Sequence, residues 1–177
     1  MSAAVFSVRV AEAVDASLLA ELGRRMFFDA FAKDNAPEDM EAYLTASFRP
    51  EQQAKELADP QTTFLILEDV GVPVGYARLR IGEAPAVITG KRPIEIVRFY
   101  AVKEWIGRGV GMALMLVCLS MAKEKGCDTI WLDVWEKNPR AIAFYKKWGF
   151  TIVGKQEFIL GSDVQQDLLM QRSVAEG

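Results

Sequence analysis

Hydrophobic positions recur along the chain at two different spacings, which predicts a mixture of helices and strands. Leu18, Leu22 and Met26 follow the helical spacing, whereas short β-prone runs lie between breaks that contain glycine or proline. A loop is predicted over 82–93, which carries Gly, Pro and a Lys-Arg pair. We predict strands over 7–10, 62–67, 74–81, 94–102, 129–135, 151–160 and 164–172, and a turn over 68–73. We predict helices from Asp15 onward, over 37–48, from the glycine-rich turn at 105–111 to about residue 125, and over 139–148.

The order of these elements predicts an α/β fold with a mixed sheet. In the second half a strand, a glycine turn, a helix, a strand and a helix follow one another, which implies at least one parallel strand pair. The last two strands meet at a short turn around Gly161 and are expected to form an antiparallel hairpin. No internal repeat or linker interrupts the 177 residues, so we expect one domain over 1–177.

Composition removes several classes of chemistry. The chain contains no histidine, so Ser-His and Cys-His catalysis and imidazole metal sites are excluded, and we expect no metal. A general base must then be a carboxylate, a lysine, a tyrosine or water. The formal net charge of −3 argues against a nucleic-acid partner. Cys118 and Cys127 have no framework spacing, and we expect reduced thiols in a cytoplasmic protein.

The N-terminal residues and the apolar runs give no sign of a membrane partner. Residues 1–10 lack a basic region followed by a long apolar run, which a signal peptide would show. The longest apolar stretch, 109–121, is shorter than the roughly 20 residues that span a membrane. We therefore interpret that stretch as a buried helix.

A glycine-rich turn over 105–111 joins a predicted strand to a predicted helix. Glycines allow close approach of the backbone, and the first turn of a helix offers unpaired N–H groups, so together they can cradle a phosphate. A tight corner without a ligand is the alternative. A dinucleotide fingerprint starting at Gly107 fails because Met112 is not small, and a P-loop starting at Gly149 fails because Gln156 stands in place of Ser or Thr.

A second cluster of candidate residues begins at Asn138-Pro139, which is typical of a helix start. Phe144, Tyr145 and Trp148 then recur at helical spacing. A packing role explains Phe144 and Trp148 well. The Tyr145 hydroxyl needs a polar partner if it faces the sheet, so both a packing role and a catalytic role stay open for it.

Charged residues also stand inside predicted strands. Asp133 interrupts a strand that is otherwise apolar on both faces, so its carboxylate must be hydrogen-bonded, paired or functional. The same holds for Glu95 and Arg98. By strict alternation, Glu95, Val97, Phe99 and Ala101 share one face of the strand over 94–102, with Arg98 and Tyr100 on the other.

Taken together, residues 98–102, 107–111, 138–145 and 148–150 resemble the GNAT superfamily of N-acetyltransferases. This resemblance implies a single-domain GNAT-like fold, with a mixed, mostly antiparallel sheet of about six or seven strands, flanking helices and a splayed central strand pair. The chain departs from the family pattern at Lys103, which replaces a proline, and at Ile106, which replaces Arg or Gln; Arg108 supplies a positive charge inside the loop. The run 135–138 and the aromatic N-terminal helices look most like the polyamine branch.

The resemblance implies acetyl-CoA as cosubstrate. The pyrophosphate would lie on backbone N–H groups of the glycine turn and of the helix start, and the pantetheine arm would pair with the strand end and bond Asn138. A backbone N–H near Ala101 would stabilise the developing oxyanion. The residues implied for cofactor binding are Phe99, Tyr100, Ala101, Gly107, Arg108, Gly109, Val110, Gly111, Met112 and Asn138.

For the reaction, the resemblance implies direct attack of a primary amine on the thioester. The base is expected to be Glu95, directly or through water, with Asp133 as the second candidate, and Tyr145 matches the position of the general acid. We favour a small-molecule amine, with a polyamine as one candidate. A protein N-terminal or lysine acetyltransferase and a non-catalytic CoA-binding regulatory module remain alternatives, and a homodimer stays open.

Two groups of residues bear on the acceptor. One consists of acidic residues that attract a cationic amine or form a solvated face: Asp29, Asp34, Glu38, Asp39 and Glu41. The other consists of aromatic residues that line an apolar channel or belong to the core: Phe27, Phe28, Phe31 and Trp135.

Overall fold

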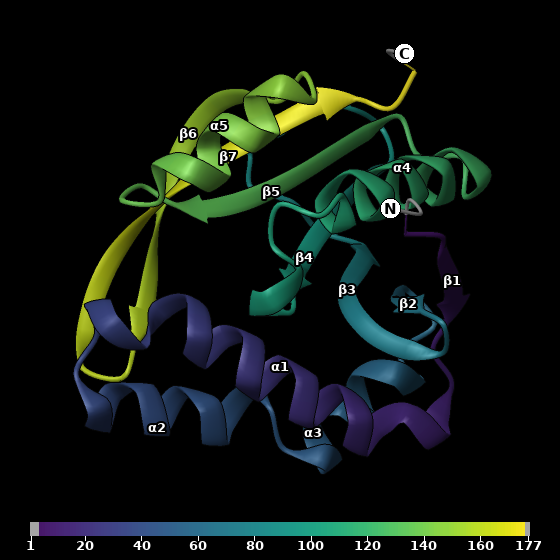
Figure 1. The fold of residues 1–177 in the computed structure, drawn as a ribbon. Helices are drawn as coiled ribbons and strands as arrows, with labels where there is room; N and C mark the ends of the chain where they lie inside the picture. Colours follow the sequence, from purple (N-terminus) through teal and green to yellow (C-terminus); the bar gives the residue numbers. More distant parts are fainter. Residues whose placement is uncertain (1–3, 176–177) are drawn as a thin grey trace.

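In the computed structural model, which describes residues 4–175, seven strands form one sheet in the order β1-β2-β3-β4-β5-β7-β6 (Figure 1). Neighbouring strands are antiparallel except for β4 and β5, which are parallel. The predicted mixed, mostly antiparallel sheet is thus confirmed. The strands are β1 (Phe6–Val10), β2 (Thr62–Asp69), β3 (Val72–Ile81), β4 (Pro93–Ala101), β5 (Thr129–Trp135), β6 (Thr151–Leu160) and β7 (Asp163–Ser173).

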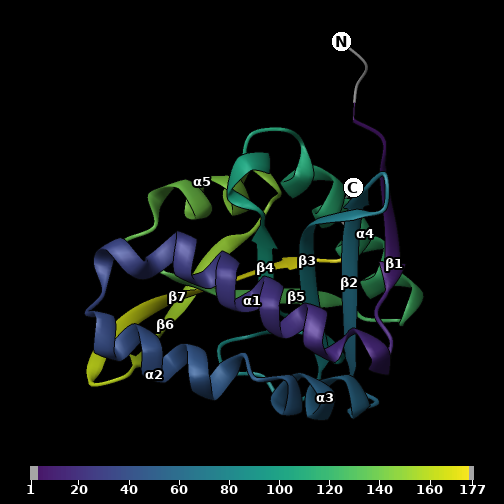
Figure 2. The same cartoon turned by 60° about the horizontal axis from the view of Figure 1, so that its bottom comes forward.

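Helices cover both faces of the sheet (Figures 1 and 2). On one face the apolar helix α4 packs Leu114, Met115 and Cys118, all 0% exposed, into a core that also includes Tyr145 of α5. On the other face α1 packs Leu19, Leu22 and Met26 against β2 and β3. The helices are α1 (Ala16–Phe31), α2 (Pro37–Ser47), α3 (Pro50–Ala58), α4 (Val110–Glu124) and α5 (Pro139–Lys147).

Helix α3 was not predicted from the sequence, because the residues it buries are polar. Its buried side chains are Gln53 and Glu56, so it shows no hydrophobic repeat. Glu56 accepts hydrogen bonds from Arg78 of β3 at 3.1 Å and from Arg98 of β4 at 2.8 and 3.0 Å. Arg98 also donates to the Gln53 side chain at 3.1 Å. Paired charges therefore hold this helix on the sheet.

A β-bulge in β4 corrects the predicted sharing of faces. Arg78 of β3 stands opposite Arg98, but the next residue, Leu79, stands opposite Ile96, so Val97 is an extra residue. The bulge puts Glu95 on the same face of the sheet as Arg98, whereas Phe99 lies on the other face. The prediction that Glu95, Phe99 and Ala101 share a face is wrong, because strict alternation has no place for the extra residue.

The splayed central pair is confirmed by the register of β4 and β5. The two strands pair from Pro93–Thr129 to Glu95–Trp131 and then run apart (Figure 1). Beyond Glu95, β4 is paired with β3 alone, so its edge toward β5 carries unpaired backbone groups at Phe99, Tyr100 and Ala101. This opening positions the site.

Candidate functional site

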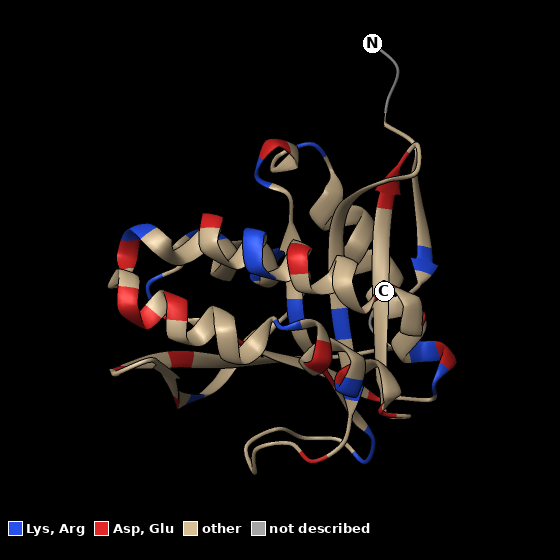
Figure 3. Cartoon of the chain, turned by 90° about the horizontal axis from the view of Figure 1, so that it is seen from below, with Lys and Arg blue, Asp and Glu red and all other residues tan. Residues whose placement is uncertain are grey.

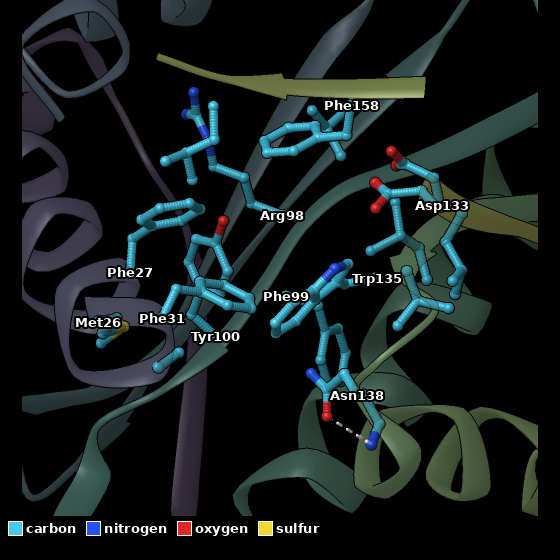
Figure 4. Close-up of a pocket in the computed structure, with 18 of the residues that line it drawn as sticks. Met26, Phe27, Phe31, Arg98, Phe99, Tyr100, Asp133, Trp135, Asn138 and Phe158 are labelled. Atoms are coloured by element: carbon cyan, nitrogen blue, oxygen red, sulfur yellow. Dashed lines mark hydrogen bonds between the residues drawn. The ribbon is translucent and has the colours of Figure 1, made fainter. Parts of the chain in front are cut away.

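A cavity of about 290 Å³ occupies the opening between β4 and β5 (Figure 4). From the face covered by α4 and α5 it is lined by Phe99, Ala101 and Tyr145, and from the face covered by α1 and α2 by Tyr43 and Asp133. The cavity therefore passes through the sheet and connects its two faces.

The glycine turn presents free main-chain amides at the start of α4. Gly107 and Gly109 have φ angles of 83° and 89°, in the left-handed region that favours glycine. Gly109 is the N-cap of α4, and no side chain caps this helix. The first helical bond runs from the Ala113 amide to the Gly109 carbonyl at 3.0 Å, which leaves the amides of Val110, Gly111 and Met112 without a helical partner.

These amides fit the diphosphate of a CoA. A Cβ added at Gly107 would meet nothing within 4 Å, so the surface of the turn is open to a ligand. The Arg108 amide donates to the Trp105 carbonyl at 3.2 Å, and its guanidinium lies 5.4 Å from the Trp105 ring centroid. Arg108 is exposed and supplies positive charge beside the turn.

Asn138 lies at the start of α5 and lines the cavity. Its Oδ1 accepts a hydrogen bond from the Ala141 amide at 3.2 Å, so the side chain caps the helix (Figure 4). The Nδ2 group is the donor that remains for a ligand. Together with the unpaired edge at Phe99, Tyr100 and Ala101, this donor fits an extended amide-bearing arm such as pantetheine.

Tyr145 faces the cavity from α5. Its side chain is 8% exposed and is packed among Phe99, Phe144 and Phe150, with ring centroids at 6.0, 5.4 and 5.7 Å. Burial raises the pKa of Tyr145, so the phenol stays protonated and can donate a hydrogen bond.

The structure separates the two candidate bases. The Glu95 carboxylate accepts from Arg80 Nη2 at 2.7 Å and lies outside the lining of the cavity. Burial raises the pKa of Glu95, although Arg80 acts in the opposite direction. Asp133 lines the cavity, and its Oδ2 accepts from Gln156 Nε2 at 3.2 Å.

Asp167 of β7 also lines the cavity and was missed by the sequence analysis. It is 6% exposed, its Oδ1 has no hydrogen-bond partner, and burial together with Asp133 raises its pKa to about 8. One signal could have found it: Asp167 directly precedes three buried residues, Leu168, Leu169 and Met170, which mark a strand buried on both faces.

An aromatic chamber forms the part of the cavity between α1, α2 and the β6–β7 hairpin. Ring pairs enclose it, with centroids at 4.5 Å for Phe27–Tyr43, 5.5 Å for Tyr43–Phe158 and 6.3 Å for Phe31–Trp135. Phe28, in contrast, is 52% exposed and lies outside the lining.

Hydrogen bonds hold the tip of the β6–β7 hairpin against α2 and the segment before it. The Ser162 amide donates to Asp39 Oδ1 at 2.9 Å, and Gln165 Nε2 donates to Asn35 Oδ1 at 2.6 Å.

Within residues 4–175, no group of three or more His, Cys, Asp or Glu side chains is arranged to hold a metal ion. None of the helices in this part of the chain is long and apolar enough to span a membrane.

Sequence comparisons give the chain relatives that cover most of its length. The model of the acetyltransferase (GNAT) family matches residues 26–150. An uncharacterized N-acetyltransferase of Lactobacillus delbrueckii subsp. lactis is 33% identical over 153 residues, which are 86% of this chain and 88% of that protein. An uncharacterized N-acetyltransferase of Mycobacterium bovis is 34% identical over 160 residues, covering 90% and 98%.

Solved structures show the same fold. A PaiA N-acetyltransferase from Thermoplasma acidophilum, in complex with coenzyme A, superposes with a TM-score of 0.75 at 20% identity, covering 96% of this chain and 99% of that one. The ribosomal-protein-S18-alanine N-acetyltransferase from Escherichia coli superposes with a TM-score of 0.70 at 15% identity, covering 98% of this chain and 96% of that one.

Proposed function

The chain belongs to the acetyltransferase (GNAT) family and is an N-acetyltransferase with acetyl-CoA as cosubstrate, and we propose that its acceptor is a small-molecule primary amine that attacks the thioester directly. One observation carries this proposal. A single cavity connects Tyr145, on the α4–α5 face of the sheet, to Asp133, on the opposite face. A phenol and a carboxylate thus line the same space from two sides.

The aromatic chamber supports a small acceptor. Contacts of Ser162 with Asp39 and of Gln165 with Asn35 fasten the β6–β7 hairpin to α2 and to the segment before it, and aromatic rings fill the walls between them. Such a chamber suits an alkyl chain better than a folded protein substrate. This is why we place a small molecule before the protein N-terminal and lysine acceptors that the fold also allows.

Surface charge supports a cationic acceptor, including a polyamine. Acidic residues gather at one end of α1 and α2 (Figure 3), and Phe31 and Asn35, from the same part of the chain, line the chamber. Asp29, Asp34 and Glu38 are exposed there. A surface of one sign raises the local concentration of ligands of the opposite sign, so this end favours the approach of an ammonium.

The cosubstrate is held by groups already described. Amides of Val110, Gly111 and Met112 would bind the diphosphate, and the β4 edge with Asn138 Nδ2 would bind the pantetheine. When bound, acetyl-CoA supplies a thioester whose acyl carbon accepts the nitrogen lone pair and whose sulfur departs with the electrons of the C–S bond.

The reaction also requires that protons be moved from the amine and to the departing sulfur. An alkylammonium must lose a proton before it can attack, and we propose that Asp133 takes it, because Asp133 lines the cavity whereas Glu95 is held by Arg80 outside it. In the alternative in which Glu95 is the base, it would act through water. The Tyr145 hydroxyl would donate a hydrogen bond to the departing sulfur.

The test compares the two carboxylates in matched variants. CoA release from acetyl-CoA is followed with a thiol reagent, with 1,4-diaminobutane, butylamine, glycine and a peptide with a free N-terminus as acceptors. We expect Asp133→Asn to lower kcat about 100-fold with the preferred amine and to change the pH–rate profile, and Glu95→Gln to retain the wild-type profile. A changed profile in Glu95→Gln alone would assign the base to Glu95.

Absence of CoA release with every amine and with the peptide would instead favour the non-catalytic CoA-binding module.

Cys118 and Cys127 are free thiols, which suit a reducing compartment, and we propose that the protein works in the cytoplasm.

A further inference from the structure

We propose that Asp133 and Asp167 together form the subsite that binds the acceptor's ammonium group. The inference rests on the proposed function and deepens it, because it names a second carboxylate and the chemical class of the acceptor.

The register of β5, β7 and β6 brings the two carboxylates to one face. Leu169 stands opposite Asp133, and Asp167 stands opposite Trp135 two residues along, so both carboxylates and the Trp135 ring point to the face that α1 covers. Gln156 of β6 stands opposite Asp167 and donates its amide to Asp133 at 3.2 Å. Both carboxylates line the cavity (Figure 4 labels Asp133).

Asp167 is the observation that points to a ligand. It is 6% exposed, and its Oδ1 has no hydrogen-bond partner although it borders the cavity. A buried carboxylate oxygen without a donor is costly, and an entering N–H group would remove that cost.

Within residues 4–175, no Lys or Arg side chain balances the charge of Asp133 and Asp167. Among the described residues, neither Asp133 nor Asp167 makes an ion pair with Lys or Arg. Nearby, Glu136 adds negative charge and is itself paired with Lys155 at 3.4 Å, and Tyr43 faces the pair from α2 as a neutral phenol. The missing positive charge is the one an ammonium brings.

The protonation of Asp167 depends on its burial beside Asp133. Burial and the Asp133 carboxylate raise the pKa of Asp167 to about 8, so Asp167 holds its proton at neutral pH while the site is empty. A bound ammonium favours the ionised form of Asp167, and this proton leaves to solvent. Asp133 can then accept an N–H proton from the ammonium, which frees the nitrogen lone pair.

The arrangement selects alkylammonium acceptors without a carboxylate beside the nitrogen. Two acids at the subsite repel an α-carboxylate, which disfavours free amino acids. The rings of Trp135, Phe31 and Phe158 offer apolar contact to the alkyl part and cation–π contact to the ammonium.

Calorimetry with the whole protein tests the subsite without requiring turnover. Binding of 1,4-diaminobutane, butylamine and glycine is measured between pH 6 and 8.5, in buffers of different ionisation enthalpy that count released protons. In the wild type we expect release of a proton at pH 7 and an affinity for alkylamines that rises about tenfold per pH unit below the raised pKa of Asp167. Asp167→Asn should bind without proton release and with a flat pH dependence.

Glu157→Gln is the matched control, since it removes an exposed acid of β6 that lies outside the cavity. It should reproduce the wild-type pH dependence. Proton release and a pH dependence unchanged in Asp167→Asn would overturn the inference, as would glycine binding as tightly as butylamine, or no alkylamine binding to the wild type. Amine binding of the expected kind without any CoA release would leave the subsite standing and defeat the proposed function.

Discussion

The two sides of the sheet provide the site with different kinds of groups. On the α4 side, one continuous segment, 107–112, offers main-chain amides. On the α1–α2 side, separate elements bring side chains together, among them Asp133 of β5, Asp167 of β7 and Tyr43 of α2. The first side depends on local backbone conformation, and the second depends on strand register.

The two sides should therefore differ in the substitutions that each can tolerate. Main-chain amides are present whatever the side chains are, so the α4 side is sensitive mainly to the loss of glycine. The α1–α2 side has carboxylates without a cation, so it is sensitive to each charge and to pH. Three predictions sharpen the contrast, and Tyr145, which lies between the two sides, comes first.

Tyr145→Phe should lower kcat about 100-fold, because it removes the hydrogen bond to the departing sulfur and nothing else. The ring keeps its contacts with Phe99, Phe144 and Phe150, so acetyl-CoA affinity should stay within about threefold. Steady-state kinetics and a binding titration check the two parts. Unchanged kcat would remove Tyr145 from the mechanism.

Gly109→Val should weaken CoA binding at least about tenfold, because a branched side chain would stand where the diphosphate approaches the backbone. The φ of 89° also strains any L residue there. Gly71→Val is the matched control, with a φ of 78° in the β2–β3 turn and open space around it. A titration that finds equal CoA affinity in both variants would contradict the placement of the diphosphate.

Asp167→Asn should stabilise the empty protein by about 1 kcal/mol at pH 8 and change nothing at pH 3. The pKa of Asp167 is raised in the folded state, so the unfolded chain releases its proton first and wild-type stability falls as pH rises from about 4 toward the raised pKa. Urea unfolding at several pH values measures this. A variant less stable than the wild type at pH 8 would show that the carboxylate has a structural partner.

Much of the fold was predictable from the sequence because its signals are local. The strands, the βαβα order and the final hairpin follow from apolar runs and glycine breaks, and the structure confirms them. Helix α3 was missed because it attaches through Gln53 and Glu56 rather than through an apolar stripe. A charge pair across 42 residues, such as Arg98 with Glu56, leaves no periodic trace in the chain.

The candidate site divides in the same way. Residues 107–112 and Asn138 could be proposed from motifs, since each motif is one continuous segment. Asp167 directly precedes an apolar run, which marks it as a charge beside a buried strand, but its role in the site arises from the side chains that the β5–β7 register places beside it. The choice between Glu95 and Asp133 likewise depended on the bulge at Val97, which no propensity rule reveals.

Val97 makes the length of β4 as important as its composition. Removing this one residue would restore regular pairing with β3 and leave the other side chains on their present faces, because Leu79–Ile96 and Arg78–Arg98 are already successive pairs. The deletion would remove the bend that a bulge gives its strand, just beyond Glu95–Trp131, the last pair of β4 with β5. A single-codon deletion would therefore straighten β4 toward β5 and narrow the opening in which the two substrates meet.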